Sequence, residues 1–266
     1  MYLISFISLE VRRMIAYRLD FWMGTVGVVG IHITVSYFLW TAVFTARGVS
    51  QIGNYSFQGM MLYAVIAPQV LKMANASQFG SISSEIYDGT LNRYLVYPVS
   101  FFWVKFMHQL AFFMVYTLQL LAALLLFRVF FGFPGEFQIN AFSILLGLGA
   151  GFLATLLWFS ISSCLEMVSF WADNVWSLLV MLRFGGAFLG GELIPLDLFP
   201  DWTRTVLAIL PFRYLVYFPI ECFLGKVGPS AFLSQAGISL VWTLSFWALG
   251  AWIWKRGTLQ YSGVGI

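Results

Sequence analysis

The residues in this sequence that could do chemistry are few, and they lie in short polar interruptions between long apolar runs. The densest interruption, Ser83–Phe102, brings together two carboxylates, Glu85 and Asp88, and the guanidinium of Arg93. Water must reach this segment, and the plainest interpretation of Glu85 and Asp88 is that they are solvated loop charges. No nucleophile, base and orienting group can be assembled from motifs in the chain, so we predict no catalytic residues.

Two further basic residues, Arg183 and Lys72, lie inside apolar runs. An arginine at the centre of a membrane helix costs about 2.5–3.5 kcal/mol, so we expect it to face water or a partner. Arg183 either contacts an anionic or polar substrate group, forms a structural pair with a carboxylate of another helix, or snorkels towards one face of the membrane. We place it, with Phe184 and Phe188, along a candidate substrate pathway. Lys72 lies nearer a helix end, where its ammonium can snorkel to the surface.

Metal and nucleotide chemistry lack their motifs in this sequence. His32 and His108 each lie in an apolar run without Asp, Glu, Cys or a second His at metal-ligand spacing, so we predict no metal site. No Gly-x-x-x-x-Gly-Lys-Ser/Thr stretch is present to cradle a phosphate. Any use of ATP therefore requires another chain, and we predict no cofactor in this one.

The elements that must position these residues are membrane helices. Of 266 residues, 61% are hydrophobic and 9% are charged, against roughly 25% charged in a soluble domain. A soluble fold of this size has too little interior to bury so much apolar surface. The net charge is +3, and the Lys and Arg residues are scattered, so we predict no nucleic-acid partner. The composition predicts an all-α integral membrane protein with lipid as its solvent.

Six apolar segments are candidates to cross a bilayer, for which about 20 residues suffice. They are Phe21–Ala46, Tyr55–Phe79, Phe106–Phe127, Phe137–Leu165, Trp171–Gly190 and Ser230–Trp254. We expect a kink at Pro68 in the second segment. The fourth carries a face of small residues around Gly147 and Gly151, which favours contact with another helix.

The ends of the chain carry their own signals. Residues 1–20 have the pattern of an amphipathic helix with basic residues, which suits the headgroup level of a membrane; a simple extension of the first span is the alternative. With six spans both termini lie on one side, and that side carries more Lys and Arg. The positive-inside rule therefore favours cytoplasmic termini.

Two polar segments break the pattern of spans. Within Ser83–Phe102 the spacing predicts a helix that leaves the membrane, a break at Asp88-Gly89 and a short second helix from Thr90 to Tyr97, after which Ser100 caps the next span. In residues 191–229, prolines divide apolar runs that are each too short to cross the membrane. We expect re-entrant or interfacial half-helices there.

These two segments also carry a resemblance. The run Glu85–Leu95, closed by Tyr97–Ser100, resembles the E-I-x-x-G-T-L-x-x-x-L-x-x-P signature between spans two and three of ABC-2-type exporter permeases. The segment Gly191–Trp202 and the later Leu210–Tyr214 are similar to the loop between spans five and six of that family. In order and spacing, the likeness covers nearly the whole chain.

The resemblance implies the permease subunit of an ATP-driven exporter in a bacterial inner membrane. Two permeases, identical or homologous, would pair with two ATPase subunits that bind ATP and Mg²⁺. Residues 1–266 would form one transmembrane domain, with a cytoplasmic coupling segment at residues 83–100 and an extracellular re-entrant segment at residues 191–229. Displacement of the coupling segment would reach spans one, two and five.

The resemblance also implies site residues on the matching positions. The candidate residues for coupling to the ATPase are Glu85, Asp88, Gly89, Thr90, Leu91, Arg93 and Tyr94. The candidate residues for a re-entrant gate are Glu192, Pro195, Phe199, Pro200 and Pro211.

Two other classes of function stay open at this point. A secondary transporter or channel working alone could use Arg183 and Lys72 as intramembrane polar sites. An intramembrane enzyme is disfavoured because no motif for one can be recognised. Co-purification of an ATPase with the chain would separate the exporter from both.

Overall fold

The computed structural model describes residues 18–75, 80–96, 100–172 and 174–261. In this part of the chain the elements are helices, apart from a two-stranded antiparallel hairpin of β1 (Gln51–Ile52) and β2 (Tyr55–Ser56). The prediction of an all-α fold is confirmed. The expected helix over residues 1–20 lies outside the described residues, except where Arg18 begins α2.

Four helical segments of the described residues are long and apolar enough to cross a membrane. They are Val29–Arg47 in α2 (Arg18–Arg47), α6 (Phe101–Phe131), α7 (Ala141–Glu166) continued by the 3-10 helix η1 (Met167–Phe170), and α12 (Pro229–Gly257). At 1.5 Å per residue, α3 (Phe57–Ala74) and α8 (Trp176–Leu189) are about 27 and 21 Å long, shorter than a hydrocarbon core of about 30 Å. The expected number of six spans therefore stays a prediction.

Several helix ends differ from the predicted spans. The third span was expected from Phe106, but α6 begins at Phe101 and includes Lys105 in its second turn. The second was expected to reach Phe79, but α3 ends at Ala74, after running on through Pro68. The fifth was expected from Trp171, but α8 begins only at Trp176 and ends at Leu189.

The fourth span begins later than predicted because a capping box defines its start. The Asn140 side chain accepts a hydrogen bond from the Ser143 N–H at 2.9 Å, and the Ser143 hydroxyl accepts one from the Asn140 N–H at 3.0 Å. These bonds satisfy donors that have no partner within the helix. The expected start at Phe137 was wrong, since Phe137 lies in the preceding loop.

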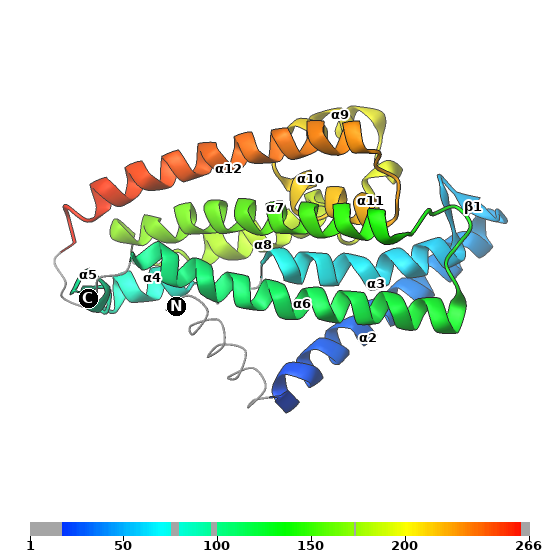
Figure 1. The fold of residues 1–266 in the computed structure, drawn as a ribbon, viewed down its shortest axis with the longest axis horizontal. Coiled ribbons are helices and arrows are strands. Elements are labelled where there is room, and N and C mark those ends of the chain that lie inside the picture. The colour runs from blue at the N-terminus through cyan, green and yellow to red at the C-terminus, as the bar shows by residue number, and fades with distance from the viewer. Residues whose placement is uncertain (1–17, 76–79, 97–99, 173, 262–266) are drawn as a thin grey trace.

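Helix α7 is the centre of the bundle and packs against α3, α11 and α12. In Figure 1 it runs lengthwise between α12 and α6. Its small residues let neighbours approach: a Cβ on Gly147 would collide with the ring of Phe223, and one on Gly151 would lie 2.8 Å from the Met73 methyl group. The predicted role of this face in helix contact is confirmed.

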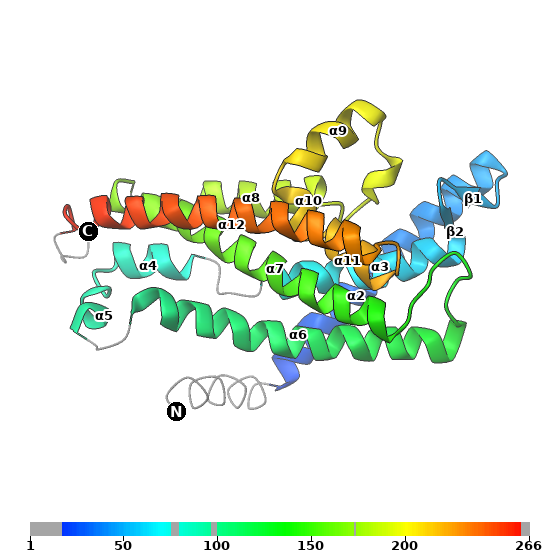
Figure 2. The ribbon, with the colours of Figure 1, turned by 45° about the horizontal axis from the view of Figure 1, so that its top comes forward.

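The long helices give the molecule two distinct ends. One end carries α4 (Ser81–Tyr87) and α5 (Asn92–Val96), close to the C-terminal end of α12 (Figures 1 and 2). We call residues 81–96 the knob. The opposite end carries the β-hairpin and the connection from α6 to α7.

Residues 191–229 fold into short helices, as predicted. They are the 3-10 helix η2 (Leu196–Leu198), α9 (Asp201–Ile209), α10 (Phe212–Leu215) and α11 (Tyr217–Phe223). Helices α10 and α11 are largely buried, whereas α9 stands apart from the bundle in Figure 2 and exposes Trp202 and Ile209. Their entry into the membrane stays a prediction.

Candidate functional site

The knob begins where α4 receives its N-terminal cap from another helix. Gly80, in the left-handed region at φ 78°, turns the chain into α4 but has no side chain to cap it. The carboxylate of Glu166, at the end of α7, instead accepts hydrogen bonds from the N–H groups of Ile82 at 2.7 Å and Ser83 at 3.3 Å. Two N–H groups without helical partners are thus satisfied from across the bundle.

The turn between the two knob helices follows the predicted break. Asp88 is the C-cap residue that follows α4, and Gly89 adopts φ 71°, which suits glycine because it has no Cβ. The chain then doubles back, and the Leu91 N–H donates to the Glu85 carbonyl at 3.0 Å. The break is confirmed, but the second helix begins at Asn92 rather than Thr90.

Ser100 occupies the predicted N-cap position of α6, but its side chain is not the cap that we expected. In the part of the chain that the structure describes, this side chain makes no capping hydrogen bond. The backbone carbonyl of Ser100 accepts a hydrogen bond from the Val104 N–H at 3.2 Å. The expected hydroxyl cap was therefore wrong.

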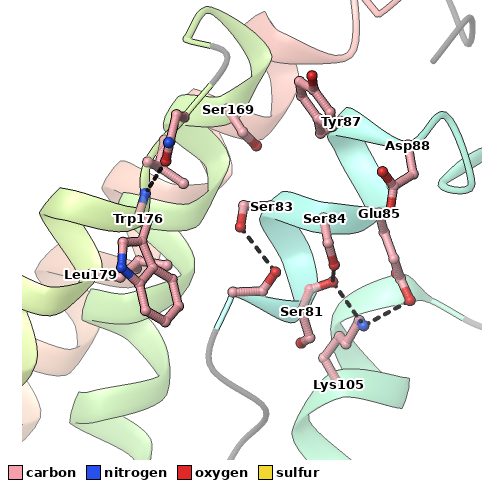
Figure 3. A pocket seen from close by; sticks show the side chains of 13 residues that line it. Ser81, Ser83, Ser84, Glu85, Tyr87, Asp88, Lys105, Ser169, Trp176 and Leu179 are labelled. Atoms are coloured by element: carbon pink, nitrogen blue, oxygen red, sulfur yellow. Dashed lines mark hydrogen bonds and ion pairs between the residues drawn. The ribbon is translucent and has the colours of Figure 1, made fainter. Parts of the chain in front are cut away.

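Glu85 is the shared partner of several polar side chains at the knob, and Figure 3 shows it turned toward Lys105. One carboxylate oxygen lies 2.9 Å from the Arg93 guanidinium and 2.9 Å from Lys105 Nζ, and accepts from the Tyr94 hydroxyl at 3.0 Å. The Glu85 side chain is only 12% exposed. Burial and the Glu85 carboxylate raise the pKa of the Tyr94 phenol, which keeps its proton for this hydrogen bond.

The other coupling candidates divide between the interior and the surface of the knob. Leu91 is fully buried in an apolar cluster with Ile82, Ile86, Phe101 and Met167. Asp88 and Thr90 are exposed, and Gly89 is partly exposed. The knob therefore braces Glu85 internally and presents Asp88 outward.

An open groove of about 520 Å³ separates the knob from the start of α8. Its walls, drawn in Figure 3, are mostly polar on the α4 side, and Trp176 and Leu179 form the α8 side. The lining residues are Gly80, Ser81, Ser83, Ser84, Glu85, Tyr87, Asp88, Lys105, Ser169, Asn174, Val175, Trp176 and Leu179.

The pathway candidates lie on α8, apart from the groove. Arg183 and Phe184 are exposed, and Phe188 packs edge-on against Phe199 with ring centres 5.7 Å apart. Glu192, just after α8, interacts electrostatically with both Arg183 and Lys72. A carboxylate therefore lies near Arg183, although it comes from the segment after its own helix rather than from another helix.

The gate candidates differ in burial. Pro195 and Pro211 are buried, Glu192 and Phe199 are half-buried and Pro200 is exposed. The chain at this point is tied to α3 because the buried Tyr63 hydroxyl donates to the carbonyl of Gly191.

Sequence reasoning missed Glu166 and Lys105 at the knob. Each is a lone charge within or beside an apolar run. Such a charge needs a partner, so its place in the sequence could have indicated a site. It also missed a cluster at the opposite end, where the Tyr55 hydroxyl donates to Asp197 at 3.3 Å and Lys226 Nζ lies 3.8 Å from the centre of the Tyr55 ring. Burial lowers the pKa of Lys226 there.

Comparison with known proteins gives one positive finding. The family model described as ABC-2 family transporter protein matches residues 31–265, which extends from α2 to the C-terminal segment. A comparison with curated proteins finds no match. The family match covers most of the chain and agrees with its long apolar helices. This multi-pass membrane protein belongs to the ABC-2 transporter family.

Proposed function

We propose that this chain is the permease subunit of an ATP-driven exporter and that its knob receives movement from separate ATPase subunits. Membership of the ABC-2 transporter family supports a transport role for the chain. The observation that carries the coupling role is the knob itself, whose helices are braced around Glu85 and whose Asp88 faces outward beside an open groove. Such a unit can transmit force because it resists deformation internally.

The proposed docking surface is the exposed side of the knob. Asp88, Thr90, Asn92 and Arg93 are exposed there and offer polar groups of both signs. Glu85 acts from behind this surface because it holds Arg93 and Tyr94 in place. ATP and Mg²⁺ would be bound and ATP hydrolysed by the ATPase subunits, while this chain performs no catalysis.

The permease would work as a pair, with identical or homologous partners. The side of α8 that carries Arg183, Phe184 and Met181 is exposed in the single chain. An arginine facing lipid is costly, so this side is better placed toward a second permease or a water-filled pathway. A translocation pathway between two copies of α8 meets this requirement, with gate residues such as Glu192 and Phe199 at its outer end.

The proposed location is a bacterial inner membrane, with the knob and both termini in the cytoplasm. Arg93 and Lys105 lie at the knob, and Lys255 and Arg256 form the last turn of α12 at the same end. This gathering of basic residues agrees with the positive-inside rule.

The test is capture of an ATPase by the full-length tagged chain, purified from membranes of its source cells. We expect an ATPase activity to co-purify with the wild-type chain. Asp88→Arg should abolish this co-purification because it reverses the charge at an exposed position of the knob. The matched control is Asp201→Arg on α9, because Asp201 is also exposed, with a 91% exposed side chain. Equal ATPase recovery with both variants would contradict docking at the knob.

A second candidate is a transporter or channel that works alone through Arg183 and Lys72. The electrostatic interaction of Glu192 with both residues favours it. This alternative expects ion-gradient-driven flux in vesicles that contain only the purified chain, and loss of that flux in Arg183→Ala. The exporter expects no such flux without the ATPase and ATP.

A further inference from the structure

We infer that Glu166 is a positioning residue that clamps the knob to α7, so that α7 carries movement of the knob to the opposite end of the bundle. This inference rests on the proposed function, because it names the route by which coupling acts. Glu166 is 3% exposed, and its carboxylate accepts hydrogen bonds from the Ile82 and Ser83 N–H groups. A carboxylate is costly to bury without such bonds, which favours a fixed geometry.

The clamp is reinforced by the residue that follows it. Met167 is 1% exposed and packs with Ile82, Ile86 and Leu91 of the knob. Polar and apolar contacts with the knob therefore come from neighbouring positions at the end of α7. A displacement of α4 that keeps these contacts has to move this end of α7 as well.

The knob also reaches α6 and α12 through aromatic contacts, which begin where Tyr94 meets Phe101 edge-on with ring centres 5.1 Å apart. Phe101, at the start of α6, stacks on Trp254 of α12 with ring centres 5.4 Å apart, and Trp254 meets Phe170 of η1 edge-on at 5.8 Å. These contacts join the knob to spans three, four and six. The sequence predicted that movement would reach spans one, two and five. The helix of the fifth span, α8, faces the knob only across the groove.

Helix α7 continues from the clamp to the opposite end. Its 26 residues span about 39 Å at 1.5 Å per residue. Near its start Gly147 lies directly against the ring of Phe223, and the Ser143 hydroxyl lies 3.4 Å from the Phe223 carbonyl. Helix α11 therefore packs against the end of α7 that lies opposite the knob. We expect residues 212–225 to be displaced when the knob moves α7.

The first experimental arm uses the purified permease alone and measures amide hydrogen exchange. Glu166→Ala should raise exchange at residues 82–84 at least tenfold and leave residues 212–225 protected. Glu166→Gln, which keeps an acceptor oxygen but loses the charge, should raise it about threefold. The control Glu136→Ala removes a carboxylate that accepts two hydrogen bonds from Ser56, and it should raise exchange only around residue 56.

The second arm uses the complex with its co-purified ATPase, with and without ADP and vanadate as the trapped nucleotide. In the wild type, trapping should change exchange both at the knob and at residues 212–225. In Glu166→Ala the change at the knob should persist, while the change at residues 212–225 should fall at least fivefold, with partial rescue in Glu166→Gln. A loss of stability alone would not separate the two segments in this way.

The outcomes distinguish this inference from the proposed function. A full wild-type response at residues 212–225 in Glu166→Ala overturns the route through α7. If Glu166→Ala does not fold, Glu166→Gln decides, and unchanged exchange in both arms overturns the inference. A wild-type chain that binds no ATPase overturns the proposed function and the coupling half of the inference, whereas unchanged exchange at residues 82–84 in the isolated variants overturns the clamp itself.

Discussion

The two ends of the bundle both use a carboxylate from a distant segment to hold the start of a helix, but their surroundings differ. At the knob, Glu166 accepts from the N–H groups of Ile82 and Ser83, and at the opposite end Glu136 accepts from the N–H and hydroxyl of Ser56, each at 2.8 Å. The first clamp lies next to an open groove of about 520 Å³. The second lies beside a tightly packed aromatic cluster.

At the opposite end of the bundle, aromatic side chains pack closely around Tyr55. The buried ring of Tyr55 meets Tyr63 and Phe137 edge-on, with ring centres 5.9 Å apart in both pairs, and Lys226 covers its face. The Tyr63 hydroxyl ties this cluster to Gly191. Substitutions here leave cavities, clashes or unpaired polar groups, so they should act mainly on stability.

The knob is held by a smaller buried apolar cluster than the opposite end. Its apolar cluster contains Leu91 and a few neighbours, and its charged residues Asp88 and Arg93 are exposed. Segments with few buried contacts move at low free-energy cost. The comparison indicates that the opposite end is rigid, whereas the knob can bind a partner and move. The following changes test this difference.

The largest effect is expected from Gly147→Ala, which adds a methyl group against the fully buried ring of Phe223. We expect a loss of about 3 kcal/mol in stability, since a packed core accommodates added volume poorly. Thermal denaturation in detergent measures it. In the control Gly149→Ala, the new Cβ would lie 3.4 Å from Phe232, an ordinary contact, so that variant should be neutral or slightly more stable. Equal melting temperatures would refute tight packing at this end.

A smaller effect is expected from Tyr63→Phe at the same end. The change leaves the carbonyl of Gly191 without its donor in a buried site, which costs about 2 kcal/mol. Denaturant unfolding followed by circular dichroism checks this value. Tyr37→Phe serves as the control because Tyr37 is 49% exposed, and it should change stability by less than about 0.5 kcal/mol.

At the knob, Gly89→Ala should cost about 1 kcal/mol, because φ 71° is unfavourable for a residue with a Cβ. The loss should be local, seen as faster amide exchange over residues 81–96 with little change in the melting temperature of the bundle. Gly135→Ala is the control, since Gly135 does not have a positive φ and a Cβ there meets nothing within 4 Å. A global loss of stability would mean that the knob is not a separate unit.

The smallest effect is expected from Arg93→Ala. The Arg93 side chain is 56% exposed, and surface ion pairs of this kind contribute less than about 0.5 kcal/mol. Lys105→Ala should cost about 1 kcal/mol or more, because Lys105 is 14% exposed and is bound to both Glu85 and the Ser81 carbonyl. Exchange rates across α4 compare the two. If Arg93→Ala has the larger effect, the brace at Glu85 is not organised as described.

Local signals in the sequence predicted much of the fold. The break at Asp88-Gly89 follows from the freedom of glycine at positive φ, and the short helices of residues 191–229 follow from the spacing of prolines. The helical class follows from apolar runs that lipid must cover. The predicted start of the fourth span at Phe137 failed because the capping box at Asn140 outweighs hydrophobicity there.

The candidate site was predicted only in part. Among the candidate coupling residues Glu85, Arg93 and Tyr94 do come together, since they are neighbours within one short motif. Lys105, which pairs with Glu85, and Glu166, which accepts from the first N–H groups of α4, were missed because the motif ends before either of them. The burial of Glu85 was also missed, since exposure depends on what packs over a side chain.

By itself, the sequence determined the helical membrane class, the position of the knob and the resemblance to a permease, because these depend on composition and on residues close together in the chain. Only the tertiary structure decided that Glu166 clamps α4, across 84 positions, and that Tyr55 meets Asp197, across 142. The physical reason is that such pairs are selected by how distant segments pack against one another. No spacing along the chain encodes that packing.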